Sequence, residues 1–198
     1  MRPLLAFLRR PRFTVRVAPV ARPAYFLEMS ALVQEVIAMV WAQDGRGRPR
    51  FALHFYVRAT PPVEGWPASI QDPLASYKQP SGPFEFYWQT IEEHSGGLSE
   101  RLKQTLVFVA AHETVHAVQC VYGQELVPDW GPGYSSTAHE RAAWSQSLDV
   151  LKAVFPEIEG SFTEFDGSVH PVPPRSSFRP RASARARRAA GQLQRRVE

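Results

Sequence analysis

The sequence has one cysteine, Cys120, among its 198 residues. A single cysteine forms no intramolecular disulfide and builds no cysteine-based zinc site. Such a chain fits a reducing compartment, so we expect a cytoplasmic protein. Cys120 lies in an apolar stretch, where a cysteine is typical of a protein core.

Long apolar runs are also missing. The longest apolar segment, residues 31–42, is interrupted by Gln34 and Glu35, whereas a membrane-spanning helix needs about 20 predominantly apolar residues. Near the start, the apolar run Leu4–Leu8 is closed by two arginines and is too short for the core of a signal peptide. We therefore expect no membrane segment and no membrane partner.

Acidic residues are almost absent from both ends of the chain. Residues 1–22 carry six arginines and no acid, and residues 175–198 carry eight arginines against Glu198 alone. Subtracting these charges from the net charge of +4 leaves −9 for residues 23–174. The sequence thus describes an acidic body with two basic ends, and such ends can neutralise phosphates in a nucleic-acid partner.

Hydrophobic periodicity and turn residues predict an alternation of strands and helices. We expect strands at 12–20, 51–59 and 84–92 and helices at 25–43, 99–123 and 137–155. Ser99 is a candidate N-cap and Gly123 a natural stop for the long central helix. Residues 60–83, rich in proline, glycine and serine, are expected to form a long loop. This order of elements predicts an α+β fold.

The chain is expected to form one folded domain with two appended segments. With 44% hydrophobic residues, it can fill one sizeable core. We place a basic N-terminal arm at 1–22, the domain at 23–160 and a flexible tail rich in proline and arginine at 161–198. The last part of the tail could be helical, but it has few apolar residues with which to pack.

The segment VFVAAHETVHAVQCVYG, residues 107–123, contains two histidines four positions apart. Residues at this spacing project from one face of a helix, so His112 and His116 can offer two imidazole nitrogens to one cation. Glu113 is rotated by roughly 100° from His112 and can act as a general base for metal-activated water. This is the arrangement of a zinc hydrolase motif.

An alternative is a buried helix whose two histidines hydrogen-bond to neighbouring groups. Burying two imidazoles and a carboxylate without a metal leaves several polar groups in need of partners, which favours the metal site. Zn²⁺ is inferred from the ligand types and their geometry, although imidazole also suits iron, nickel and copper.

The motif, across residues 109–118, resembles that of the zincin metallopeptidases. The metzincin branch has Gly and His where this chain has Gln119 and Tyr122, so that branch is excluded. The gluzincin branch instead places a glutamate on the following helix. The segment TAHERAAW supplies Glu140 there, with Ala143 three positions later.

The resemblance covers about residues 24–155 and implies a zincin-like core. In such a core a small mixed sheet packs on the motif helix and on a following helix that carries the third ligand. Two histidines and one carboxylate leave the fourth zinc position open for water, which is typical of a catalytic site.

Two alternatives compete with Glu140 as the third ligand. Thr137 and Glu140 also form a Thr-x-x-Glu capping box, in which the glutamate would bond the backbone amide at the start of the helix. His139 could supply a third imidazole instead, which would resemble the branch that includes DNA-associated SprT-like proteases. We expect Glu140 to be the ligand.

The resemblance implies a zinc-dependent metallopeptidase acting on a peptide or protein substrate. Zinc held by His112, His116 and Glu140 would activate water, and Glu113 would take the proton and return it to the leaving amine. Tyr134 is either a hydrogen-bond donor to a developing oxyanion or an ordinary loop aromatic. The strand at 84–92 is the candidate for pairing with an extended substrate, and the alternative is that its aromatic residues simply pack in the core.

Two other functions fit parts of the sequence. The arginine-rich ends favour a nucleic-acid-associated regulatory factor, although aromatic residues are sparse there. A zincin fold that keeps the metal but has lost proteolysis would be a binding module, and the intact Glu113 argues against it. His54, His94 and His170 have no partner that the sequence identifies.

Overall fold

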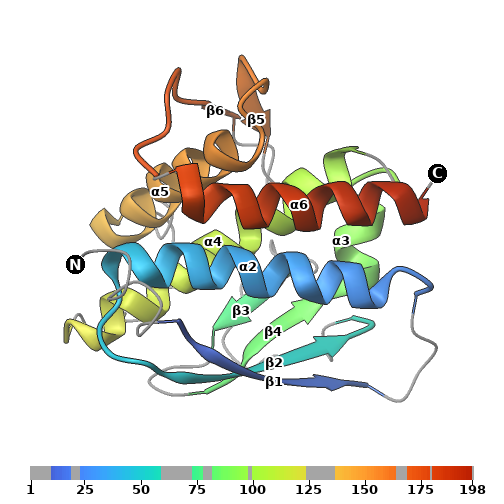
Figure 1. Cartoon of the computed structure of the whole chain (residues 1–198), viewed down its shortest axis with the longest axis horizontal. Helices are drawn as coiled ribbons and strands as arrows, with labels where there is room; N and C mark the ends of the chain where they lie inside the picture. The colour runs from blue at the N-terminus through green and yellow to red at the C-terminus, as the bar shows by residue number, and fades with distance from the viewer. Residues whose placement is uncertain are drawn as a thin grey trace.

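The computed structural model describes residues 10–18, 23–58, 73–77, 82–97, 100–123, 137–163, 169–178 and 180–197. These residues form a four-stranded mixed sheet with helices packed on one of its faces, and a separate two-stranded hairpin (Figure 1). The predicted α+β class and small mixed sheet are therefore confirmed.

The sheet consists of β1 (Arg12–Val17), β2 (Arg50–Tyr56), β3 (Ala75–Tyr77) and β4 (Phe84–Tyr87), in the order β1-β2-β4-β3. β2 runs parallel to β1 and to β4, and β3 is antiparallel to β4. A parallel pair needs a crossover connection, and the helix between β1 and β2 supplies it. In this strand order β4 is internal, and β3 forms one edge of the sheet.

The large apolar residues of the central strands β2 and β4 that are buried at alternate positions face the helical layer. In β2, Phe51, Leu53 and Phe55 are buried, while the residues between them are more exposed. This is the period of two expected for a strand with one buried face. Phe84 packs edge-on against Phe51, and Phe86 stacks on Phe55, so the pairing of β2 with β4 continues into the core.

Two helices cover this face of the sheet: α2 (Phe26–Asp44) and α4 (Glu100–Val121). On α2, buried Met29, Val33, Val36, Ile37 and Val40 recur at a helical spacing, and Leu32, Met39 and Trp41 between them are buried as well. α5 (Ala138–Val154) packs on α4. The predicted spans of these helices are confirmed within one or two residues over the described part, which omits Ser99.

Residues 84–92 and 60–83 differ from expectation. The predicted strand ends at Tyr87, and the chain continues as a short helix, α3 (Trp88–His94). Aromatic residues favour strands and continue past Tyr87, so their propensity does not mark the end of the strand. The predicted loop contains β3, which is too short for a visible alternation and depends on its pairing with β4.

The C-terminal segment is not a flexible tail where the structure describes it. After a hairpin of β5 (Ser161–Thr163) and β6 (Val169–Pro171), the chain forms α6 (Pro180–Val197), which lies along α2 (Figure 1). Leu193 and three alanines are buried: Ala186, Ala189 and Ala190. Small side chains let two helices approach closely, so α6 packs with few large apolar residues.

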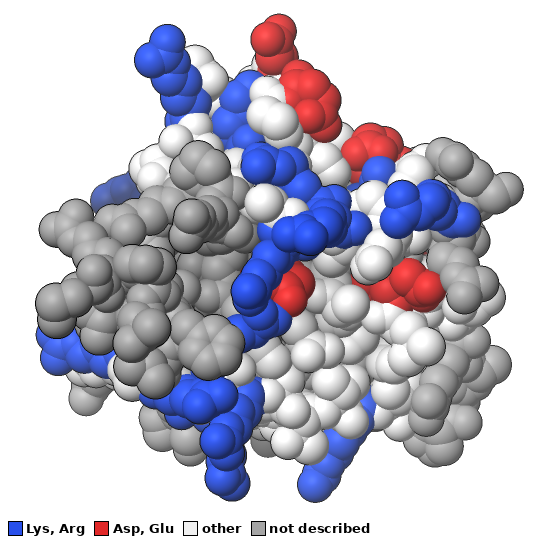
Figure 2. All heavy atoms as spheres, viewed as in Figure 1, with Lys and Arg blue, Asp and Glu red and all other residues white. Residues whose placement is uncertain are grey.

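Both arginine-rich segments contain elements that pack on the rest of the protein. β1 lies within the proposed basic arm but pairs with β2 over its whole length. On α6 the arginines divide by face: Arg185, Arg188 and Arg195 are exposed, and Figure 2 shows Lys and Arg atoms in a band over this helix. Arg187 turns inward and donates a hydrogen bond to the Ala153 carbonyl at 2.7 Å.

Among the helices in the described part of the chain, none combines the length and the apolarity that a bilayer span requires.

Candidate metal centre

α4 presents His112 and His116 side by side. Their rings lie 4.6 Å apart at 82°, and the two Nε2 atoms are 3.0 Å apart. The residues from 105 to 111, just before the motif, are uncharged and buried, as is typical of a helix that packs in the core. Gly123, with φ of 74°, follows its end, in the left-handed conformation common after helices.

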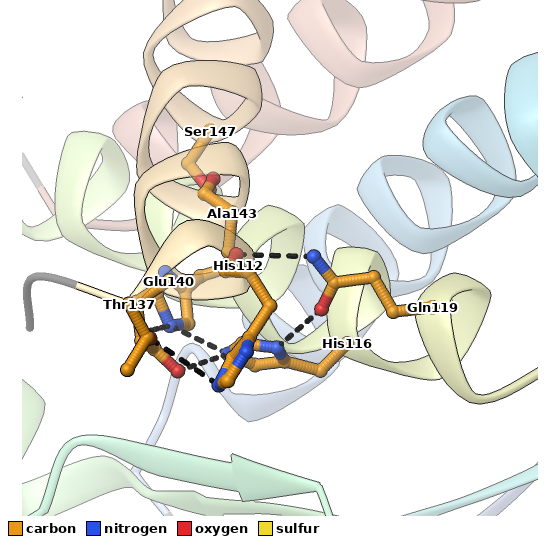
Figure 3. Close-up of polar contacts among 8 residues, drawn as sticks. His112, His116, Gln119, Thr137, Glu140, Ala143 and Ser147 are labelled. Atoms are coloured by element: carbon orange, nitrogen blue, oxygen red, sulfur yellow. Dashed lines mark hydrogen bonds and ion pairs between the residues drawn. The ribbon is translucent and has the colours of Figure 1, made fainter. Parts of the chain in front are cut away.

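α5 brings Glu140 to the two histidines. The residue is 2% exposed, and its Oε2 lies 3.2 Å from His112 Nε2 while Oε1 lies 3.1 Å from His116 Nε2 (Figure 3). Thr137 occupies the N-cap position, where no side chain makes a capping hydrogen bond. Glu140 therefore does not form the capping box, and its carboxylate points to the imidazoles.

His139 points elsewhere. Its Nε2 lies 3.3 Å from the Thr137 hydroxyl, and its ring centre is 6.4 Å from that of His116. In the described residues, the group with metal-ligating geometry consists of His112, His116 and Glu140, whose ligand atoms all lie within 4.8 Å of one another.

The spacing of these atoms fits a tetrahedral zinc ion. Bonds of about 2.0–2.1 Å to N and O place two ligand atoms of a tetrahedron about 3.3 Å apart, close to the 3.0–3.2 Å separations here. Within the described part of the chain, His112 Nδ1 is buried without a hydrogen bond, and the buried Glu140 Oε1 has only the ion-pair contact with His116 Nε2 at 3.1 Å. A cation among the three ligand atoms would satisfy the buried carboxylate oxygen.

The electrostatics of the cluster favour a positive charge between its members. Burial raises the pKa of the Glu140 carboxyl, but the hydrogen bonds and charges of His112 and His116 outweigh it and leave the pKa well below its usual value. Burial lowers the pKa of His116, but Glu140 and Glu113 outweigh this effect and raise it. Glu140 is therefore held as a carboxylate.

The side chain of Glu113, on α4, reaches the edge strand β3. Burial raises the pKa of its carboxyl group, opposed by His112 and His116 and by a hydrogen bond from the backbone of Tyr77 in β3. That hydrogen bond turns Glu113 towards the sheet, and Glu140 approaches the histidines from α5. The two carboxylates thus occupy different sides of the site.

Gln119 also belongs to the site. From the sequence alone, this residue only showed that the chain lacks the glycine of the metzincin pattern. Its Oε1 is 2.9 Å from His116 Nδ1, and its amide nitrogen donates to the His139 carbonyl at 3.0 Å. The signal that could have identified it is its spacing of three residues from His116, which places both side chains on one face of α4.

The other residues singled out in the sequence stay apart from this cluster. Tyr134 lies outside the described residues. Cys120 is only partly buried, rather than in the core, because it precedes the last residue of α4. His54 Nδ1 lies 3.3 Å from the Tyr56 hydroxyl, and the His170 ring packs at 5.0 Å from Trp144.

Comparisons with known proteins give no further guide to this site. The chain matches no family model, no curated protein and no solved structure. A proposed function therefore depends on the geometry of the cluster and on the resemblance of its motif.

Proposed function

We propose that this protein is a zinc-dependent metallopeptidase of the zincin type. His112, His116 and Glu140 would hold the metal, and Glu113 would serve as general base. The supporting observation is the position of Glu140, which is 2% exposed on a different helix yet lies within 3.2 Å of both imidazoles. Two histidines and one carboxylate are a ligand set of catalytic zinc sites.

The residues around the cluster divide the chemistry between them. Zinc bound there would supply Lewis-acid chemistry for hydrolysis. Glu113 would accept a proton from the attacking water and return it to the amine that leaves. Tyr134 is a candidate hydrogen-bond donor to the oxyanion, with an ordinary loop aromatic as the alternative. Glu113 is partly buried, and its carboxyl group is close enough to His112 and His116 to feel their charges.

The strand expected to pair with the substrate, within residues 84–92, is not free to do so. β4 pairs with β2 on one side and with β3 on the other. In the described part of the sheet, β3 is the edge strand next to Glu113, through the Tyr77 backbone. We assign pairing with an extended peptide to β3, because an edge strand has backbone groups available for another chain.

Metal content and turnover test this proposal. We expect about one zinc per chain in the native protein by elemental mass spectrometry, lost in His116→Ala and retained in the control His54→Ala. Glu113→Gln should keep the zinc but lose peptide hydrolysis, by on the order of 100-fold or more, because it removes the base. No zinc in native protein offered the metal, or full turnover by Glu113→Gln, would contradict the proposal.

A second candidate function is binding of nucleic acid through α6. The observation in its favour is the exposure of Arg185, Arg188 and Arg195 on one helix. Replacing all three by Gln should weaken salt-dependent DNA binding, whereas replacing Arg12, Arg16 and Arg50, exposed on the sheet, removes the same charge elsewhere. Equal losses in both triple variants, or no binding at low salt, would count against this function.

A further inference from the structure

Gln119 lies at the contact between α4 and α5, one turn beyond His116. Its side chain is 8% exposed and reaches from α4 towards the start of α5, with its carbonyl end at the His116 ring (Figure 3). Both ends of the amide make hydrogen bonds, at 2.9 Å to His116 Nδ1 and at 3.0 Å to the backbone oxygen of His139.

The second hydrogen bond determines the orientation of the first. A backbone carbonyl can only accept, so the NH₂ group of Gln119 must face His139 and its Oε1 must face His116. The ring nitrogen Nδ1 then donates its proton to Oε1. In the neutral ring, His116 Nε2 consequently carries a lone pair, and this is the atom that lies beside His112 Nε2 and Glu140 Oε1.

The same amide also connects two metal-ligating positions. His139 directly precedes Glu140, so the hydrogen bond to its carbonyl links α4 to the turn of α5 that carries the carboxylate. His112 has no comparable support in the described residues, because its buried Nδ1 makes no hydrogen bond there. One glutamine thus orients one imidazole and holds the backbone beside the carboxylate.

We propose that Gln119 is a positioning residue of the metal centre, an inference that rests on the proposed zinc site. It selects the tautomer of His116 that has Nε2 free for the metal and fixes the first turn of α5 next to that ring. Groups that hydrogen-bond to metal-ligating histidines commonly affect metal affinity by about 10–100-fold. A glutamine that only joined two helices would affect folding alone.

Three variants separate these roles. Gln119→Leu removes both hydrogen bonds at similar volume, Gln119→Glu keeps the acceptor for His116 Nδ1, and Gln104→Leu removes a glutamine from the far end of α4 as a control. Zinc affinity would be measured by chelator competition and ligand geometry by the visible spectrum of the Co²⁺ form. We expect Gln119→Leu to bind zinc about 10–100-fold more weakly and Gln104→Leu to stay within about threefold of the native affinity. Gln119→Glu, which keeps the acceptor for His116 but loses the donor to the His139 carbonyl, should lie between them.

Unfolding of the metal-free proteins supplies the second readout. If Gln119→Leu lowers stability but binds zinc as tightly as the native protein, Gln119 is structural and the inference is wrong. If the native protein binds no zinc, the proposed function itself fails.

The tautomer can be tested without any variant. Long-range ¹H–¹⁵N NMR of the metal-free native protein, at a pH where the ring is neutral, should show His116 protonated at Nδ1. Protonation at Nε2 would overturn the inference even if Gln119→Leu does not fold.

Discussion

Two helix pairs in this protein pack in opposite ways. Where α6 meets α2, the buried side chains of α6 include alanines and Leu193, and its exposed arginines face away. Where α4 meets α5, the contact buries the polar side chains of His116, Gln119 and Glu140. The first contact is ordinary apolar packing, and the second encloses groups that would be better solvated in water.

The difference bears on where this protein could bind a ligand. Burying a polar group is unfavourable unless it finds a partner, and a buried carboxylate is more costly still. Apolar residues at the α4–α5 contact would stabilise the metal-free fold as well or better. The buried His116 and Glu140 are therefore best explained by a ligand that interacts with both, as the proposed zinc would.

The largest expected effect comes from breaking the polar contact. Glu140→Gln keeps the size of the side chain but removes its charge, so we expect zinc affinity to fall by about 100-fold or more, since zinc binds anionic oxygen far better than an amide. His139→Ala, the matched control, should retain zinc. Isothermal titration of both proteins measures the difference, and the reverse order would make His139 the third ligand.

Breaking the apolar contact should affect stability alone. Leu193 is fully buried, and we expect Leu193→Ala to lower the free energy of unfolding by about 2–4 kcal/mol, as for other large-to-small core changes. The control Leu27→Ala removes a leucine that is 75% exposed, and should change stability by less than about 0.5 kcal/mol. Urea denaturation measures both. The zinc affinity of the folded variants should be unchanged. A weaker zinc affinity in Leu193→Ala would show that the α2–α6 contact influences the site between α4 and α5.

The smallest effect is expected where the two helix pairs meet. Asp44, the last residue of α2, accepts a hydrogen bond from Gln146 of α5, and burial raises the pKa of its carboxyl group. The carboxyl group thus has a higher pKa in the folded than in the unfolded protein. Its ionisation therefore lowers the stability of the fold as the pH rises from below about 4. Asp44→Asn should therefore be as stable as the native protein, or slightly more stable, at pH 7.

The pH dependence of that difference provides the check. The advantage of Asp44→Asn over the native protein should shrink as the pH falls below about 4, where the native carboxyl group is also neutral. Thermal unfolding of both proteins between pH 3 and 7 measures it. A native protein that gains stability relative to the variant as pH rises would contradict the raised pKa.

The sequence predicts least well those segments whose structure depends on packing or pairing with another element. Residues 180–197 were expected to be flexible because they contain few large apolar residues, but their alanines pack against α2. The three residues of β3 could not be predicted from their own pattern, because the hydrogen bonds of β4 hold them in the sheet. In both cases the structure depends on a neighbouring element and not on the pattern of the segment itself.

Local sequence determined the parts of the site that lie on one helix. The spacing of His112 and His116 places both imidazoles on one face of α4, because residues four apart are neighbours in any α-helix. Helix patterning also predicted α2, α4 and α5 closely. Glu140 and His139 are adjacent on α5 and therefore point in different directions, but the sequence does not say which of them faces α4. The preference for Glu140 came only from the resemblance to the gluzincins.

Only the tertiary structure decided how the helices meet. The packing of α5 on α4 turned the Glu140 carboxylate towards the histidines and His139 away from them. The same packing placed the His139 carbonyl at the amide of Gln119. These contacts depend on the distance and angle between two helices, which are set by the buried surfaces of both and are not encoded in the pattern of either one.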